Sequence, residues 1–222
     1  MENKSMPQPY GKFEAAIEDI KTGATQVRFL GNGSESEVFE MSVDDDLYAA
    51  KFAIAWTRIG RPRDTARATQ RKIDAGMRGL YVPGLEQIQS ASTDAGVAIY
   101  SLVDGKNVAS MAEEEIAQIT DDQMASFFET VDAAVEIGIE FDPWNQDGSN
   151  VMFSPQEGFT LIDYFVDYAE TDKEESRLNG YRSLGSQAIN LAQRFGADGY
   201  EFRFNYSSVD DFNKPQKKPN SR

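Results

Sequence analysis

Residues 26–55 decide the fold, and they read QVRFLGNGSESEVFEMSVDDDLYAAKFAIA. Segments rich in β-branched and aromatic residues are separated by a glycine-containing turn and an acidic turn, and these segments lie around 27–30, 38–42 and 47–54. The pattern predicts an antiparallel meander of three strands. Two later segments, 84–91 and 96–108, predict further strands, so the first part of the chain is expected to be rich in β-structure.

The second part of the chain favours helices and one hairpin. The TDDQ sequence at 120–123 is a capping-box pattern, and an apolar face follows it until Gly138 ends the helix. The face consists of Met124, Phe127, Phe128, Val131, Ala134 and Val135. Residues 151–162, with the turn PQEG, predict a short hairpin. Further helices are expected from Pro62 and over 184–195, which gives an α+β fold class.

Composition limits the kinds of chemistry that the chain can perform. Its 222 residues, 40% of them hydrophobic, can bury one core or build two lobes that share a cleft. The net charge of −15 disfavours nucleic acid and anionic lipid as partners. Since Cys and His are absent, disulfides, thiolate catalysis and imidazole metal sites are excluded, and oxygen atoms must hold any metal. No apolar run of membrane-spanning length or signal-peptide core occurs, so we expect a cytoplasmic protein or one exported without a cleaved signal.

A set of small and charged residues suggests phosphate chemistry. Gly31 and Gly33 lie in a loop between two predicted strands, where the backbone can fold closely over a ligand. Lys51 is a charged residue in an otherwise apolar strand, where a phosphate would satisfy it. Asn150 and Asp163 flank the predicted hairpin and offer oxygen ligands to a hard cation. With Asp142 to orient a nucleophile, these parts suffice for phosphoryl transfer.

Over residues 26–166 the chain resembles the protein-kinase-like superfamily. The resemblance lies in five segments taken in order: LGNGSESEV, YAAKF, AIYSLVDGKNV, EFDPWNQDGSN and IDYF. They are similar to the glycine loop, the lysine strand, the strand and hinge that hold adenine, the catalytic loop and the DFG motif. The resemblance implies a bilobal fold with an antiparallel β-rich N-lobe at 23–105 and a truncated, mainly helical C-lobe at 106–212. Residues 1–22 would be an N-terminal extension and 213–222 a disordered tail.

The resemblance also implies an ATP- and magnesium-dependent phosphotransferase. Its ATP-binding residues would be Gly31, Gly33, Ser34, Val38, Ala49, Lys51, Ser101 and Val103. In this reading Lys51 holds the α and β phosphates and also counts as catalytic, Asp142 is the base, and Asn150 with Asp163 binds Mg²⁺. The small second lobe is similar to compact kinases that pathogenic bacteria secrete into host cells. A protein kinase that modifies Ser or Thr hydroxyls of a host protein is the expected function.

Several residues depart from the family pattern and leave alternatives open. Eight positions separate Asp142 from Asn150, more than in the family, so Asp147 could be the base instead, or no base exists. Ser36 stands where the third glycine of the loop would be. The region 61–78 contains no Glu to pair with Lys51, and Asp74 is the candidate there. The DFG glycine is missing. A pseudokinase that acts as a binding module, a small-molecule kinase and an AMP transferase are therefore the alternatives.

Residues 58–78 are unusually basic for this acidic protein. They carry seven basic and two acidic side chains. A helix face exposed to solvent explains this composition, and so does a docking surface for an acidic partner such as a phosphoprotein or an inositol phosphate. Charge reversal at Arg67 and Arg71 would separate the two interpretations.

Overall fold

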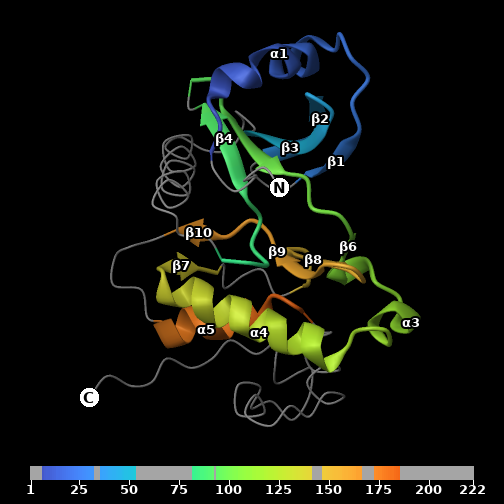
Figure 1. Cartoon of the computed structure of the whole chain (residues 1–222), viewed down its shortest axis with the longest axis vertical. Helices are drawn as coiled ribbons and strands as arrows, with labels where there is room; N and C mark the ends of the chain where they lie inside the picture. The colour runs from blue at the N-terminus through green and yellow to red at the C-terminus, as the bar shows by residue number, and fades with distance from the viewer. Residues whose placement is uncertain are drawn as a thin grey trace. The chain divides into compact units, whose positions relative to one another are not determined.

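The structure is a computed structural model, and it describes residues 7–32, 36–53, 82–92, 94–141, 147–166 and 173–185 (Figure 1). These residues form an α+β structure with an antiparallel sheet and several helices, as the sequence predicts. The chain divides into two compact units. The first contains residues 1–104 and 165–169, and the second contains residues 105–164 and 170–222. This division is compatible with a bilobal α+β fold.

The first unit is built on a five-stranded antiparallel sheet in the order β1-β2-β3-β5-β4. Its strands are β1 (Phe29–Asn32), β2 (Ser36–Val43), β3 (Asp46–Ala53), β4 (Ile88–Ser92) and β5 (Val97–Ser101). The meander predicted from residues 26–55 is therefore confirmed. The short strand β10 (Phe165–Val166) also belongs to this unit.

The turn between β2 and β3 consists of Asp44 and Asp45, because Val43 pairs with Asp46 across the hairpin. Both aspartates have positive φ, 53° and 66°. Two consecutive left-handed residues define the type I′ turn, whose twist matches that of the flanking strands. Aspartate tolerates this conformation better than most residues other than glycine. The acidic triplet thus makes a tight two-residue loop.

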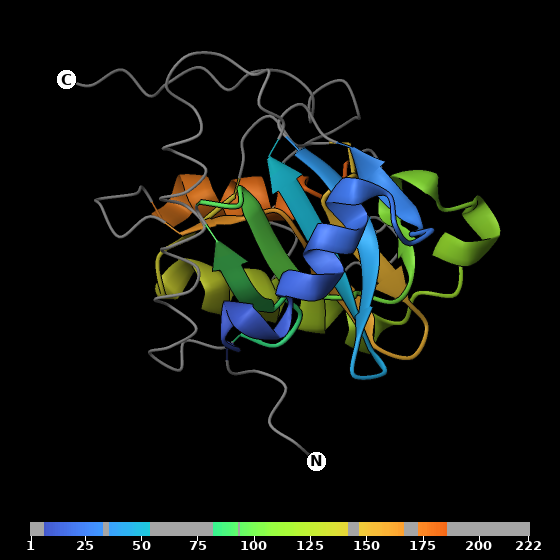
Figure 2. The same cartoon turned by 90° about the horizontal axis from the view of Figure 1, so that it is seen from above.

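Helix α1 (Glu14–Thr22) covers one face of this sheet, after a 3₁₀ turn at Tyr10–Lys12 (Figure 2). The sequence analysis assigned no element to residues 1–22, so this helix was missed. Its apolar residues recur at helical spacing, and Gly23 ends it in the left-handed conformation with φ 67°. Phe13 and Ile17 are buried against Tyr48 and Ala50 of β3. The helix therefore completes the core of the first unit.

The second unit combines helices with a three-stranded sheet in the order β6-β8-β9. Its strands are β6 (Lys106–Asn107), β7 (Ile139–Glu140), β8 (Val151–Ser154) and β9 (Gly158–Leu161). Its helices are η2 (Val108–Ser110), α3 (Glu113–Ile116), α4 (Asp121–Glu136) and α5 (Lys173–Arg182). The predicted hairpin at 151–162 is confirmed as the pair β8 and β9.

The predicted helix after Thr120 is confirmed as α4. The Thr120 hydroxyl accepts from the Gln123 N–H at 3.3 Å, and the Thr120 N–H donates to Gln123 Oε1 at 2.9 Å, which is the reciprocal capping box. All six residues of the predicted apolar face are buried. Phe127 packs on Phe159 of β9 with ring centroids 5.2 Å apart, and Phe128 packs edge-on against Tyr181 of α5 at 5.1 Å. Helix α4 therefore joins the hairpin to α5.

Helix α5 differs from the prediction for this region. The sequence predicted a helix that starts at Leu184, but Leu184 and Gly185 lie in a turn, and Gly185 has φ 65°. The helix ends at Arg182 instead. Residues 186–195 of the predicted helix lie outside the described residues. The region 173–182 was missed because it has few apolar residues and contains both Asn179 and Gly180, which are poor helix formers.

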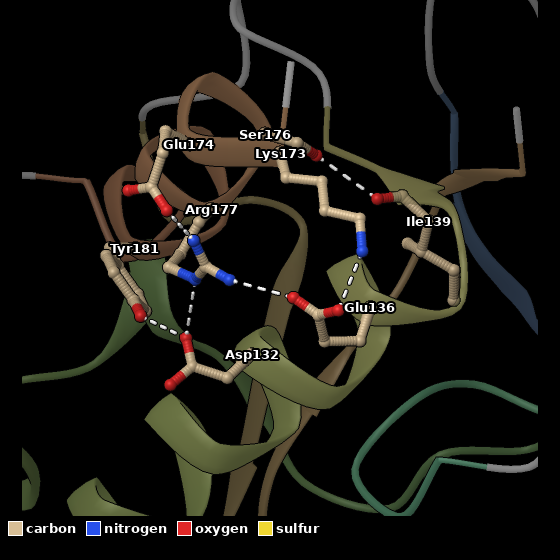
Figure 3. A network of polar contacts seen from close by, with 8 residues as sticks. All are labelled: Asp132, Glu136, Ile139, Lys173, Glu174, Ser176, Arg177 and Tyr181. Carbon is tan, nitrogen blue, oxygen red and sulfur yellow. Dashed lines mark hydrogen bonds and ion pairs between the residues drawn. The ribbon is translucent and has the colours of Figure 1, made fainter. Parts of the chain in front are cut away.

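A network of charged side chains fastens α5 to α4 (Figure 3). The Arg177 side chain, 18% exposed, contacts Asp132, Glu136 and Glu174. The Tyr181 hydroxyl also donates to Asp132. Lys173 Nζ donates to Glu136 Oε2 at 2.7 Å, and this hydrogen bond lowers the pKa of Glu136. Polar contacts thus replace the missing apolar stripe of α5.

Gly180 allows α5 to approach α4 closely. A Cβ atom at this position would lie 2.6 Å from Val131 Cγ1 and 2.8 Å from Phe141 Cδ2, and both side chains are buried. Gly180→Ala should therefore destabilise the protein by about 1–3 kcal/mol through overpacking. At an open helix position the same change would stabilise by about 1 kcal/mol. Urea denaturation distinguishes the two signs.

The double variant Val131→Ala/Gly180→Ala tests whether this contact is the cause. Removal of the valine methyl groups makes room for the new Cβ. The double variant should therefore lose less stability than the sum of the losses of the two single variants. A Gly180→Ala variant that is more stable than the wild type would contradict the packing explanation.

Candidate functional site

The β8–β9 hairpin brings two of the predicted metal ligands to one end of the second unit. Val151 pairs with Leu161, and beyond this pair the Ile162 N–H donates to the Asn150 carbonyl at 2.9 Å. The backbone of Asn150 therefore lies beside Ile162, and Asp163 follows directly. Asp163 has a positive φ of 56°, which is uncommon for residues other than glycine and is often found at functional sites.

The loop before Asn150 is held from several directions. The Ser149 N–H donates to Asp147 Oδ1 at 2.8 Å, and the Ser149 carbonyl accepts from Asn107 Nδ2. Gly148 is buried, with φ 84°, and a Cβ atom there would lie 3.0 Å from the Ala109 nitrogen. A Cβ atom on Gly185 would lie 2.5 Å from the Asp147 carbonyl carbon. Two glycines thus permit close packing of this loop.

Asp147 has a structural role in this loop. Its carboxylate accepts from Ser149, and the hydrogen bond to the Ser149 side chain, with the backbone N–H, lowers the pKa of Asp147 below its ordinary value of 3.8. The geometry therefore favours Asp147 as a loop-stabilising residue.

Acidification should loosen this loop. Because the pKa of Asp147 is lower in the folded protein than in the unfolded chain, its stabilising effect is present above pH ~4 and is lost as the pH falls through the folded value. Exchange of the Ser149 amide hydrogen should therefore show increased opening below pH ~4, after correction for the intrinsic pH dependence of exchange. Asp147→Asn keeps an acceptor oxygen and loses the charge, so its opening should show no such transition. If the wild type and Asp147→Asn showed the same increase in opening at low pH, a group other than Asp147 would be its cause.

In the first unit, three predicted nucleotide-binding residues share one face of the sheet. Val38 pairs with Lys51, and Glu40 pairs with Ala49. Tyr48 and Ala50 belong to the cluster under α1, so the alternating residues Ala49 and Lys51 project from the opposite face. On that face a second apolar cluster consists of Ile88, Ala98 and Tyr100, with Ala49 and Ala91 packed against it. A half-buried lysine and an apolar surface therefore lie next to each other.

The predicted hinge begins at the end of β5. The Ser101 N–H donates to the Gln87 carbonyl at 2.9 Å, and its hydroxyl accepts from Gln89 Nε2 at 2.7 Å. The Leu102 N–H donates to the Leu47 carbonyl at 3.4 Å. These contacts fasten Ser101 and Leu102 within the first unit. Val103 follows them and is half-buried, and the roles of Ser101 and Val103 in adenine binding stay predictions.

Gly31 lies in β1 and pairs with Val38, next to an irregularity in the β1–β2 register. Several other predicted residues lie outside the described residues. They are Gly33 and Ser34 of the glycine loop, Asp74 and the basic stretch 58–78, and Asp142 of the segment similar to the catalytic loop. Their roles stay predictions.

Within the described ranges no group of three or more Asp or Glu side chains could hold a metal ion. Mg²⁺ in phosphate-transfer sites is commonly held by one or two protein ligands, completed by water and substrate phosphates. The pair Asn150 and Asp163 therefore fits this type of site by the chemistry of its donors and by its place at one hairpin end. No helix in the part of the chain that the structure describes has the length and apolar character needed to span a membrane.

Comparison with protein-family models finds no match to this chain, and comparison with curated proteins finds no significant match.

Proposed function

We propose that this protein is an ATP- and magnesium-dependent phosphotransferase, and specifically a minimal protein kinase that modifies Ser or Thr hydroxyls. One observation carries the proposal: Val38, Ala49 and Lys51 share the sheet face opposite α1, while Asn150 and Asp163 end one hairpin. These are the groups that phosphoryl transfer requires, namely a cation for phosphates, an apolar surface for a base and oxygen ligands for a metal.

The first unit supplies the nucleotide-binding groups of the proposed site. The Lys51 ammonium can donate to phosphate oxygens, and such charge-assisted hydrogen bonds are stronger than neutral ones. The adjacent apolar cluster around Tyr100 and Ala98 is buried, and the half-buried Ala49 packs against it. Ala49 and Val38 would supply the apolar contacts that an adenine ring prefers. Val103 contributes its backbone, and Gly31 leads into the loop that would cover the phosphates. This division of a face into apolar and cationic parts supports a nucleoside triphosphate as the ligand.

The second unit supplies the metal-binding groups. Asn150 and Asp163 would hold Mg²⁺ through a carboxamide oxygen and a carboxylate. When bound, the ion neutralises phosphate charge that grows during transfer. The hydrogen bond from the Ile162 N–H to the Asn150 carbonyl holds the two strand ends together. Since Asp163 follows Ile162 directly, the two proposed ligand residues are close neighbours. Asp142, by the resemblance, would orient the acceptor hydroxyl.

The resemblance to compact kinases that pathogenic bacteria secrete into host cells supports a protein acceptor. We therefore favour Ser or Thr hydroxyls of a host protein. The basic stretch 58–78 would then bind an acidic partner.

The test is transfer of label from γ-labelled ATP, with purified protein, magnesium and a cell lysate, together with intact-mass measurement of any modified band. A mass increase of one phosphate on a protein supports the proposed kinase. An AMP adduct instead would change the assigned reaction. Magnesium-dependent nucleotide binding without any transfer would point to a pseudokinase that acts through contact.

A further inference from the structure

Asn107 connects two segments that are 42 residues apart in sequence. Its Nδ2 donates to the Ser149 carbonyl, and its Oδ1 accepts from the Ala109 N–H at 3.0 Å. The same Ala109 N–H also lies 3.3 Å from the Gly148 carbonyl. One half-buried carboxamide at the end of β6 thus reaches the loop that leads to Asn150.

The orientation of this carboxamide is fixed by its partners. Ala109 presents an N–H and Ser149 presents a carbonyl oxygen, so only one of the two possible orientations satisfies both. A flipped amide would turn its NH₂ group toward the Ala109 N–H and its oxygen toward the Ser149 carbonyl, so neither hydrogen bond could form. Strand β6 holds this residue in place, because Asn107 pairs with Met152 of β8.

These contacts fix the backbone on both sides of Asn150. The peptide group that precedes Asn150 contains the Ser149 carbonyl, which Asn107 binds. The peptide group that follows contains the Asn150 carbonyl, which accepts from the Ile162 N–H at 2.9 Å. Because each peptide group is planar, holding both planes sets φ and ψ of Asn150 and therefore the direction of its side chain.

We propose that Asn107 is a positioning residue for the magnesium ligand Asn150. This inference rests on the proposed function and extends it to a residue to which the resemblance assigns no role. Groups that orient metal ligands through hydrogen bonds commonly change metal affinity by about 10–100-fold when they are replaced. Asn107 acts through the Ser149 peptide and touches neither the nucleotide nor the metal in this scheme.

The sharpest variant is Asn107→Asp, which is nearly isosteric. It keeps an oxygen for the Ala109 N–H, loses the donor to Ser149, and sets a carboxylate oxygen against a carbonyl oxygen. Ser110→Ala is the matched control, because it removes a hydrogen bond from the same turn without touching residues 148–150. Both proteins are titrated with MgCl₂ at a fixed, subsaturating concentration of a fluorescent ATP analogue, and nucleotide binding is read by fluorescence. Thermal melting of each variant without ligand reports folding.

For Asn107→Asp we expect the magnesium concentration at half-maximal binding to rise by about 10-fold or more, with full binding restored at high magnesium. Ser110→Ala should bind like the wild type. An unchanged magnesium midpoint in a folded Asn107→Asp variant would reduce Asn107 to a structural role. If Asn107→Asp does not fold, Asn107→Ser, which retains a shorter hydroxyl donor, serves in its place. A wild-type protein without magnesium-dependent nucleotide binding would overturn the proposed function itself, a result distinct from failure of the variant.

Discussion

Asp163→Asn should reduce magnesium-dependent phosphoryl transfer by about 10²–10³-fold while the fold remains intact. Asp163 adopts a left-handed backbone conformation, with φ 56°, that Asn accepts almost as well as Asp. The substitution therefore removes the negative charge with little added strain. Loss of a charged metal ligand weakens both the binding of the ion and the neutralisation of phosphate charge. Label transfer from γ-labelled ATP measures the effect.

The control for Asp163→Asn lies on the same hairpin. Glu157→Ala removes an exposed carboxylate at the turn, the end of the hairpin opposite Asp163, and should leave transfer unchanged. Lys51→Ala should reduce transfer to a similar extent, because it removes the phosphate-binding cation. Asp163→Ala is less clean, since alanine disfavours positive φ. Full transfer by a folded Asp163→Asn variant would refute the assignment of the metal site.

Gly105→Ala should destabilise the second unit by about 2–4 kcal/mol. Gly105 has φ 124°, a conformation that residues with a side chain rarely adopt. Its Cβ would lie 2.7 Å from the Phe153 carbonyl carbon and 3.1 Å from the Ser154 nitrogen. These are backbone atoms of β8 and cannot move aside cheaply. Urea denaturation followed by circular dichroism measures the loss.

Gly96→Ala separates backbone strain from steric contact. Gly96 also has positive φ, 64°, but no atom lies within 4 Å of the position of its Cβ. The variant should therefore show only the cost of the left-handed conformation, about 1 kcal/mol. If Gly105→Ala and Gly96→Ala lowered the free energy of unfolding equally, the close approach of Gly105 to β8 would not contribute to the loss.

Local rules made much of the fold predictable. The capping box at Thr120, the turn residues of the β8–β9 hairpin and the acidic turn before β3 each act over a few neighbouring residues. Helix α5 escaped prediction because its stability comes from contacts of Arg177 and Tyr181 with Asp132 of α4 rather than from an apolar pattern of its own. Helix α1 was overlooked although Phe13, Ile17 and Gly23 carried an apolar spacing and a C-terminal signal.

In the candidate site, too, the sequence predicts the features that depend on neighbouring residues and misses those that depend on remote contacts. Asn150 and Asp163 lie close together because they flank a hairpin that the sequence predicts. Val38 and Lys51 lie on one face because they pair across two predicted strands. Asn107 carried no comparable signal, because its partner Ser149 is remote in sequence and the contact depends on how β6 pairs with β8. Asp147 was considered as a base from its type and position alone. The structure shows its hydrogen bond to Ser149, and its role as a base stays a prediction.

The two-residue turn at Asp44 and Asp45 has a consequence for how this protein tolerates changes in chain length. Strand alternation has a period of two, so the number of residues in this loop determines which side chains of β3 face α1. Substitutions within the loop alter stability only. Insertion of a single residue that shifts the β2–β3 pairing by one position would exchange the two faces, turning Lys51 into the core and Tyr48 and Ala50 out of it. Loop length is therefore the variable on which the chemistry of this sheet depends.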